Sequence, residues 1–382
     1  MRVAERSFFL FFRIGYSDGI PSKGVTMKRI AFIAGTRPEV IKLSPLVRLC
    51  RRQGGLQAFL LTPEQHRELL SSALAECSLT PDLVFPLSGG LTEKTALSLF
   101  HLSSALRTLS PNAVVVQGDT LSAYAGALAA FYQRIPLFHV EAGLRTASPF
   151  SPFPEEFYRR GIDTVSTLLF APTEEAAKNL SREGKTSGVY VVGNTGIDSL
   201  FEDISPDFSH PFLKGERKTV LLTLHRRESL GAPLAEICHA VREALLTRED
   251  TTLLFPMHPN PEIDAVVRPI LGDMTNVTLA PPLDKVTFRN LLARVTLCLS
   301  DSGGVSEEAT ALGTPTLVLR DETERPEGVA AGVLFPVGRT RTRIRAVLTA
   351  FLDEPRPRSP SSVFGDGKAS ERILKIIEAY FT

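Results

Sequence analysis

Short apolar runs alternate with helix-like stretches along most of the chain, and this alternation constrains the fold more than any other feature of the sequence. One set of runs lies at residues 30–34, 113–116, 137–140, 168–170 and 189–192, and a second at 220–222, 253–255, 297–299 and 317–319. Strands of this length between helices are typical of βαβ units, which build parallel sheets covered by helices. Two consecutive sets predict an α/β protein with two doubly wound domains.

The expected domain boundaries follow from chain length and loop composition. With 382 residues the chain is long enough for two domains. The segment 202–218, which contains proline and glycine, lies between the two sets of runs. We therefore expect one domain over 27–201 and a second over 202–368. A loop rich in proline, serine and arginine at 355–362 precedes a last predicted helix at 369–380.

The first 26 residues do not fit this pattern. The strand-like start of the fold is at 27–33, and the apolar stretch at 8–12 is too short for a membrane span or the core of a signal peptide. We expect Met27 to be the natural start, and 1–26 to be a non-native or disordered extension.

Composition excludes several classes of function. Hydrophobic residues make up 43% and charged residues 22% of the chain, which is ordinary for a globular protein. The net charge of +1 gives no basis for nucleic acid or an anionic membrane as a partner. There is no P-loop, no G-x-G-x-x-G and no cluster of metal ligands, so we expect no metal site. The four cysteines are dispersed, which fits a reducing cytoplasm: Cys50, Cys77, Cys238 and Cys298.

The segment 139–146, HVEAGLRT, places charges directly after a buried apolar run. Buried charges are costly unless they are paired or used, and ligands bind at the carboxyl ends of strands in open parallel sheets. Together with the PFPEE sequence that follows, this segment predicts an active site. Its candidate residues are Glu141, Arg145, Glu155 and Arg159.

Two further candidates follow earlier strands. The stretch GTRPE at 35–39 begins a helix whose N-terminus favours an anion, so Arg37 and Lys42 could contact a phosphate. The alternative is a capped helix with solvated basic side chains. Asp119 follows the run at 113–116 and is either a helix cap or an acid/base partner of the other carboxylates.

The second domain carries comparable motifs after its own strands. His225 and Arg226 suit a diphosphate or, alternatively, a surface ion-pair loop, and His258 lies in HPNP, which has the composition of a turn. In the segment 301–308 a strand ends, two glycines expose the backbone and a helix begins, as in a phosphate cradle. Glu308, one turn into that helix, is placed to bind ribose hydroxyls.

These motifs, in this order, resemble the non-hydrolysing UDP-N-acetylglucosamine 2-epimerase family. The matching blocks span residues 27–332 and are GTRPEVIK, GDT, HVEAGLRT, PFPEE, GNTGID, TLHRRES, HPNP, SDSGGVSEEA and TERPE. The resemblance implies two facing Rossmann-like domains of the type B glycosyltransferase fold, with the active site in the cleft between them. It also implies that the domain over 202–368 binds UDP and that the last helix, 369–382, packs back on the first domain.

The resemblance further implies an activity: inversion at carbon 2 of UDP-N-acetylglucosamine, giving UDP-N-acetylmannosamine, without a cofactor. UDP would leave and add back through a 2-acetamidoglucal intermediate. The implied catalytic residues are Asp119, Glu141, Glu155 and His225. The implied substrate-binding residues are Arg37, Lys42, Arg145, Arg159, Asn194, Arg226, His258, Ser302, Gly303, Gly304, Glu308 and Arg325. A cytoplasmic homodimer is expected.

Three alternatives remain: a hydrolysing relative that releases UDP and N-acetylmannosamine, a retaining glycosyltransferase, and a nucleotide-sugar-binding protein without turnover. The chain also departs from the family pattern at Tyr158, Ser229 and Ser306. In the signature of the family's activating UDP-N-acetylglucosamine site, Glu68 stands where an amide is expected. A charge there would repel a phosphate, so we expect allosteric activation to be weakened or absent.

Overall fold

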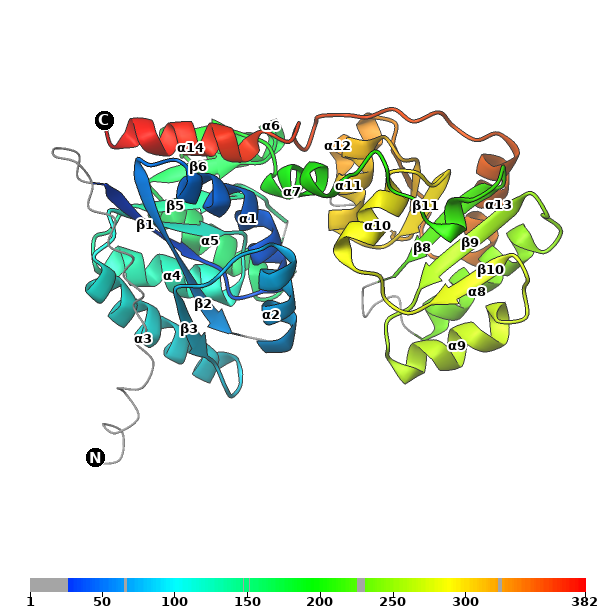
Figure 1. Cartoon of the computed structure of the whole chain (residues 1–382), viewed down its shortest axis with the longest axis horizontal. Helices are drawn as coiled ribbons and strands as arrows, with labels where there is room; N and C mark the ends of the chain where they lie inside the picture. Colours follow the sequence, from blue (N-terminus) through cyan, green and yellow to red (C-terminus); the bar gives the residue numbers. More distant parts are fainter. Residues whose placement is uncertain (1–26, 65–66, 147, 151, 225–230, 322–324) are drawn as a thin grey trace.

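Two lobes make up the computed structural model, which describes residues 27–64, 67–146, 148–150, 152–224, 231–321 and 325–382. Each lobe is a parallel sheet with helices on both faces (Figure 1). The α/β fold expected from the sequence is therefore confirmed, whereas the expected extension at 1–26 lies outside the described residues. In the described part of the chain, no helix is long and apolar enough to cross a membrane.

The first lobe holds a seven-stranded sheet with the order β3-β2-β1-β4-β5-β6-β7. Its strands are β1 Lys28–Ile33, β2 Leu56–Glu64, β3 Leu83–Pro86, β4 Ala113–Gln117, β5 Leu137–Val140, β6 Leu168–Ala171 and β7 Val189–Val191. Its helices are α1 Arg37–Arg52, α2 Arg67–Glu76, α3 Leu91–Leu109, α4 Leu121–Tyr132, α5 Glu155–Val165, α6 Glu174–Arg182 and α7 Thr195–Asp203.

The second lobe holds a six-stranded sheet with the order β10-β9-β8-β11-β12-β13. Its strands are β8 Lys218–Thr223, β9 Thr251–Pro256, β10 Val277–Ala280, β11 Leu297–Ser300, β12 Thr316–Val318 and β13 Leu334–Pro336. Its helices are α8 Ala232–Leu245, α9 Pro261–Leu271, α10 Lys285–Leu292, α11 Gly303–Leu312, α12 Pro326–Ala330 and α13 Arg341–Asp353. A 3₁₀ helix, Pro211–Leu213, precedes β8.

Alternate residues of the central strands enter separate cores on the two faces of each sheet. In β1, Ile30 and Phe32 join the core under α1 and α2, whereas Ala31 and Ile33 join the core under α3 and α4. Successive side chains of a strand point to opposite faces, so a sheet covered on both faces needs apolar residues at every position. This requirement explains why the sequence shows continuous apolar runs rather than alternation.

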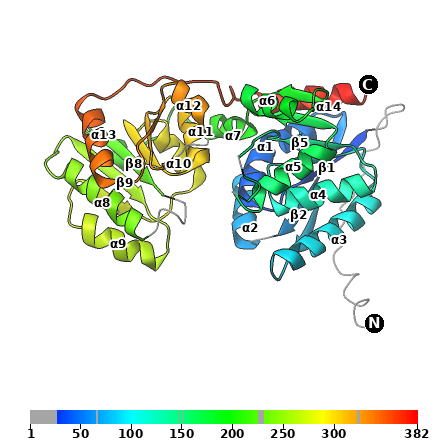
Figure 2. The ribbon, with the colours of Figure 1, turned by 180° about the vertical axis from the view of Figure 1, so that it is seen from behind.

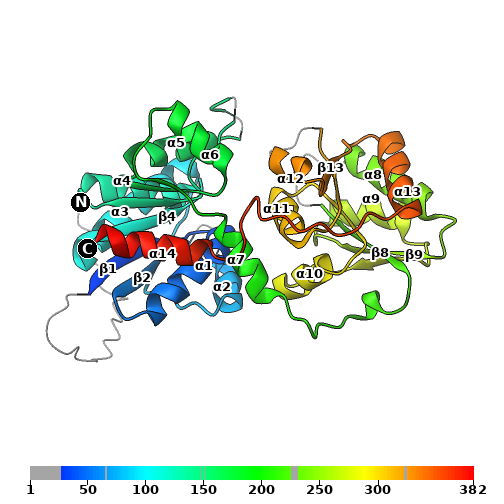
Figure 3. The same cartoon turned by 90° about the horizontal axis from the view of Figure 1, so that it is seen from above.

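The last helix, α14 Ala369–Tyr380, returns from the second lobe and packs against the first (Figures 2 and 3). Ile373, Leu374 and Ile377 are buried in the core that contains β1 and α1. The Asp198 carboxylate in α7 accepts hydrogen bonds from the backbone of Ala369 and Ser370 at 3.0 and 2.6 Å, which satisfies free N–H groups at the start of α14. The chain thus crosses between the lobes twice.

All nine apolar runs overlap strands, but four strands lie outside them: β2, β3, β10 and β13. Three of these, β3, β10 and β13, are edge strands. Edge strands are covered less completely, and β3 alternates half-buried and exposed residues. Short apolar runs at 83–85 and 333–335 do overlap β3 and β13, but they were not among the predicted strands.

A buried carboxyl joins the start of α1 to the turn after β4. Glu39 is fully buried and accepts hydrogen bonds from Thr36 Oγ1 at 2.7 Å, Thr120 Oγ1 at 2.6 Å and Gly35 N at 3.1 Å. Burial, only partly offset by these hydrogen bonds, raises the pKa of Glu39 from 4.5 to about 7. This carboxyl therefore takes up a proton on folding in mildly acidic solution.

Glu39→Gln tests this linkage. Because the folded pKa is raised, its stabilising contribution is fully present below about pH 4.5 and is lost as the pH rises to about 7. The free energy of unfolding of the native protein, minus that of Glu39→Gln, should fall by about 1.4 kcal/mol per pH unit across this window. Urea titrations at several pH values measure the difference, and a flat difference would contradict the raised pKa.

Candidate functional site

The two lobes approach each other where α7 packs against α11, and where α1 and the turn after β5 come under the influence of charges from the second lobe. Asn194, which directly precedes α7, donates a hydrogen bond to Glu307 Oε2 in α11 at 2.6 Å, and both side chains are buried. The charges of Lys42 and Glu307 also act on each other across this boundary. Predicted site residues from both lobes therefore share one region of the structure.

Glu141 lies at the centre of this region, directly after β5. Its backbone has φ of +70°, a left-handed conformation that costs a residue with a side chain roughly 1–3 kcal/mol. Its Oε2 accepts hydrogen bonds from Lys42 Nζ at 2.5 Å and from Gln117 Nε2. Burial alone would raise the pKa of Glu141, but Lys42, Arg325 and Arg159 hold that pKa below its usual value. The carboxylate is therefore ionised and able to accept a proton.

Asp119 is the second carboxylate of the region and follows β4, the strand beside β5. Arg159 Nη2 donates to Asp119 Oδ2, and the side chain of Asp119 is 28% exposed. Arg159 Nε is buried and has no hydrogen-bond partner among the described residues. A buried guanidinium N–H without a partner is costly, which suits a position that a ligand oxygen can occupy.

Lys42 and Arg325 surround the carboxylates with positive charge. Lys42 contacts Glu141, and Arg325 Nε donates to Glu307 Oε1. Burial opposes the charged form of Lys42, but Glu141 and Glu307 raise the pKa of this amine above its ordinary value. The sequence predicted that Lys42 contacts phosphate; in the structure its amine pairs with Glu141.

The start of α11 has the geometry of an anion site. Ser302 is the N-cap, and its side chain accepts from Val305 N at 3.5 Å. A Cβ added to Gly303 would lie 3.6 Å from Arg325 Nη2, and one added to Gly304 would meet nothing within 4 Å. The helix N-terminus therefore combines exposed backbone with an adjacent guanidinium, as a diphosphate requires.

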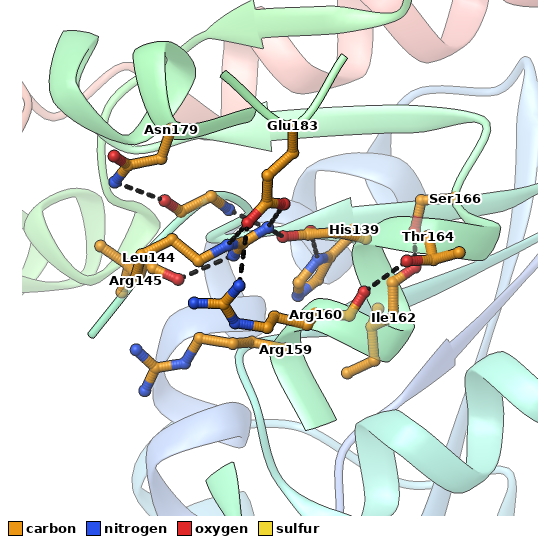
Figure 4. Close-up of polar contacts among 12 residues, drawn as sticks. His139, Leu144, Arg145, Arg159, Arg160, Ile162, Thr164, Ser166, Asn179 and Glu183 are labelled. Carbon is orange, nitrogen blue, oxygen red and sulfur yellow. Dashed lines mark hydrogen bonds and ion pairs between the residues drawn. The ribbon is translucent and has the colours of Figure 1, made fainter. Parts of the chain in front are cut away.

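Several predicted residues have other partners or stand apart. Arg37 Nη2 pairs with Glu76 at 3.1 Å, and Arg145 pairs with Asp163 and Glu183. Arg145, Arg160 and Glu183 converge beside His139 in Figure 4, while Arg159 points away from Glu183. These contacts assign Arg145 a place in a cluster of ion pairs.

The contacts of Glu155 and Glu308 do not test the roles predicted for them, so both roles remain expectations. Glu155 begins α5, is half-buried and makes no hydrogen bond or ion pair with the described residues. Glu308 Oε1 accepts from Arg289 Nε and Nη2 at 2.9 and 2.5 Å. Both contacts use one oxygen atom, Oε1.

The remaining predicted positions lie either outside the described residues or on exposed parts of the structure. His225, Arg226 and Ser229 lie outside the described residues, as do the first two residues of the activator signature. Glu68 is exposed in the first turn of α2, and His258 is exposed between β9 and α9. No group of histidine, cysteine or acidic side chains in the described ranges could hold a metal ion.

The sequence did not single out four residues that shape the region. Gln117 directly precedes the GDT block and had no assigned role, and Glu307 lies in the SDSGGVSEEA block beside the favoured Glu308. Glu156 is fully buried and accepts from Arg160 Nε at 2.6 Å. Arg289 gave no signal, because its partners come from α7 and α11, far away in the sequence.

The chain is similar to proteins of a known family over most of its length. The model of the UDP-N-acetylglucosamine 2-epimerase family matches residues 48–378. The Bacillus subtilis (strain 168) UDP-N-acetylglucosamine 2-epimerase is 40% identical over 357 residues, covering 91% of this chain and 94% of the relative. The resemblance seen in the motifs is therefore confirmed over most of the sequence.

Solved structures of this family show the same similarity. S. aureus MnaA in complex with UDP is 40% identical with a TM-score of 0.85, over 93% of this chain and 97% of that chain. The Neisseria meningitidis UDP-GlcNAc 2-epimerase bound to UDP-GlcNAc is 34% identical with a TM-score of 0.84, over 93% and 100%. The spinosyn rhamnosyltransferase SpnG, 15% identical with a TM-score of 0.51, shares the fold alone, which is the expected type B glycosyltransferase architecture. The chain belongs to the UDP-N-acetylglucosamine 2-epimerase family.

Proposed function

We propose that this protein interconverts UDP-N-acetylglucosamine and UDP-N-acetylmannosamine by eliminating and re-adding UDP. The observation that carries the proposal is the position of two carboxylates, Asp119 and Glu141, after adjacent strands, with Glu141 under the influence of Arg325, which lies beside the start of α11. Relatives with the same fold hold UDP or UDP-GlcNAc in their structures. A proton-transfer pair beside a diphosphate cradle is what this reaction requires.

The steps of this reaction explain why the site needs both a proton-transfer pair and a cradle for the diphosphate. A base removes the proton on carbon 2 while the bond between carbon 1 and the diphosphate oxygen breaks, and its electron pair leaves with UDP. A double bond then joins carbons 1 and 2 of the acetamidoglucal. Proton delivery to the opposite face of carbon 2, with renewed bonding of UDP at carbon 1, gives the epimer. Glu141, held ionised, suits proton removal, and Asp119, Glu155 and His225 are the other acid/base candidates.

The departing diphosphate needs positive charge and N–H donors. Backbone groups at Gly303 and Gly304, with the guanidinium of Arg325 beside them, supply these from the second lobe. The buried Nε of Arg159 offers a further donor from the first lobe. Holding UDP between the lobes would keep the glucal away from water, as enclosed active sites do.

Deuterium exchange tests the reaction. In deuterated water with UDP-N-acetylglucosamine, NMR should show deuterium at carbon 2 of two interconverting UDP-sugars. Glu141→Gln should lower kcat about 10²–10⁴-fold, because the neutral amide cannot accept the proton. Glu175→Gln, at an exposed ion pair with Arg182, is the matched control and should keep full activity.

The same spectra separate the alternatives. Free UDP with free N-acetylmannosamine would assign the protein to the hydrolysing branch. The absence of any exchange in the native protein would reject the proposal.

The pH dependence of kcat in a Lys42 variant tests whether the ionisation of Glu141 controls the reaction. Because Lys42 lowers the pKa of Glu141, Lys42→Met should raise that pKa and move the acidic limb of the kcat profile upward by about one pH unit. Lys178→Met removes an exposed lysine that pairs with Glu175 and should leave the profile unchanged. An unshifted acidic limb in Lys42→Met would show that Glu141 does not set it.

We also propose that the active form is a homodimer assembled through α3, α4 and α5. These neighbouring helices expose large aromatic side chains: Phe100, Phe131, Tyr132 and Phe157. Exposed apolar patches of this kind mark interaction surfaces.

Light scattering after gel filtration checks the assembly. The native protein should have the mass of two chains, and Phe131→Glu combined with Tyr132→Glu should give one, because charges would enter the apolar interface. Leu246→Glu, at an exposed site in the second lobe, is the control and should remain dimeric. A monomeric native protein would contradict the proposal.

The cytoplasm is the compartment in which we place this activity. All four cysteines are buried and unpaired in the structure. Thiols that stay unpaired are usual in reducing compartments.

A further inference from the structure

His139 is a completely buried ionisable side chain for which the proposed reaction has no use. It lies on β5, two residues before Glu141, and its ring is bound at both nitrogens. Nδ1 lies 2.6 Å from Asp163 Oδ1, and Nε2 lies 2.8 Å from the carbonyl oxygen of Gly118. Buried polar groups need partners, and here both partners are supplied by the fold.

The identity of the partners determines where the protons are. A carbonyl oxygen only accepts, so Nε2 carries a hydrogen and donates it to Gly118. Asp163 also pairs with Arg145 Nη2 at 2.8 Å and accepts from Gly143 N at 3.2 Å. Burial alone would raise the pKa of Asp163, but His139 and Arg145 hold it below its usual value. Nδ1 therefore faces a carboxylate and also carries a hydrogen.

The charged groups around the ring come from three elements. Asp163 belongs to α5, Arg145 follows β5, and Glu183 follows α6 and pairs with Arg145 at 2.6 Å. Figure 4 shows Arg145 and Glu183 next to the ring. The carboxylate of Asp163 lies directly against Nδ1, and an opposite charge at this distance makes a buried imidazolium tolerable.

The contact with Gly118 acts on Asp119. The Gly118 carbonyl belongs to the peptide unit that leads into Asp119, and a peptide unit is planar. Gly118 has φ of +69°, and its own N–H donates to Val140 O at 2.9 Å. Both polar backbone groups of Gly118 are therefore bound by β5, so its peptide plane cannot rotate without breaking the bond from His139.

We infer that His139 is a positioning residue for Asp119: its Nε2–H fixes the peptide unit before Asp119 and thereby the direction of that carboxylate. The inference rests on the proposed function, in which Asp119 takes part in proton transfer. Arg159 holds the carboxylate end of Asp119, and His139 holds its backbone end. The side chain is thus constrained at both ends.

Two substitutions at one site separate the two contacts of the ring. In His139→Gln the amide nitrogen reaches the place of Nε2 and keeps a donor toward Gly118. In His139→Asn the amide nitrogen occupies the place of Nδ1 and keeps only the contact with Asp163. Both remove the charge, and both leave Asp163 paired with Arg145. The readouts are kcat and KM for epimerisation and the thermal midpoint Tm.

His139→Asn should lower kcat by about 100-fold, with KM changed less than about 3-fold, as expected for a misplaced catalytic group. His139→Gln should stay within about 10-fold of native kcat at a similar Tm. Equal kcat values for the two variants, or a larger loss in His139→Gln, would overturn the inference.

The Asp119→Asn variant, measured in the same experiment, separates this inference from the proposed function of Asp119. If Asp119→Asn keeps the native kcat, both the catalytic role of Asp119 and the inference about His139 are wrong. If Asp119→Asn loses kcat but His139→Asn and His139→Gln have equal kcat values, only the inference about His139 is wrong.

A measurement on the native protein covers the case in which a variant does not fold. Protein labelled with ¹⁵N-histidine should show one imidazole that carries a slowly exchanging proton on each nitrogen, because both nitrogens are bound inside the fold. If every slowly exchanging ring lacks a proton on Nε2, the inference is wrong.

Discussion

Glu141 is a negative charge whose side chain is only 10% exposed, at the point where the two lobes meet, and the surrounding structure compensates that charge. Lys42 from α1 and Gln117 from β4 contact its carboxylate, and Arg325 from the second lobe acts on it electrostatically. Removing one partner of a buried ion pair typically costs about 3–5 kcal/mol. The arrangement therefore links the ionisation of a catalytic candidate to the placement of both lobes.

The same contacts make the lobes depend on each other. Glu307 in α11 binds Asn194 of the first lobe and Arg325 of the second, so the helix that begins at the proposed diphosphate site is tied to the opposite sheet. The α14 helix adds an apolar tie, because its buried face completes the core beneath β1 and α1. Closure of the lobes around a substrate would have to occur within these constraints.

Backbone geometry is as important as charge in this site. Glu141 has a positive φ, and Gly143, two residues later, has φ of +85°. A Cβ on Gly143 would lie 2.3 Å from the carbonyl oxygen of Ala176, so the turn after β5 packs directly on α6. Strained residues of this kind persist only where the surrounding structure determines their conformation, and they cluster at functional sites. The turn after β4 is held comparably, by Glu39 from α1 and by His139 from β5.

Prediction from sequence succeeded where a local pattern carries the structural information. Strands covered on both faces need continuous apolar residues, so most central strands were visible. The missed strands are β2 and three edge strands, β3, β10 and β13. The charged motifs were found because they stand at strand ends, where charge is unexpected. Arg37 and Arg145 were recognised as motif residues, but their actual partners, Glu76 and Glu183, lie 39 and 38 residues away and leave no local signal.

The sequence by itself determined the α/β class, the two sheets, the motifs at the strand ends and the family. Those properties depend on residue periodicity and on short segments, which are read along the chain. The tertiary structure alone decided which charges neighbour one another: Lys42 with Glu141, Asn194 with Glu307, and His139 with Asp163 and Gly118. Protonation and orientation depend on distances and burial, and these arise only when segments far apart in the sequence are packed together.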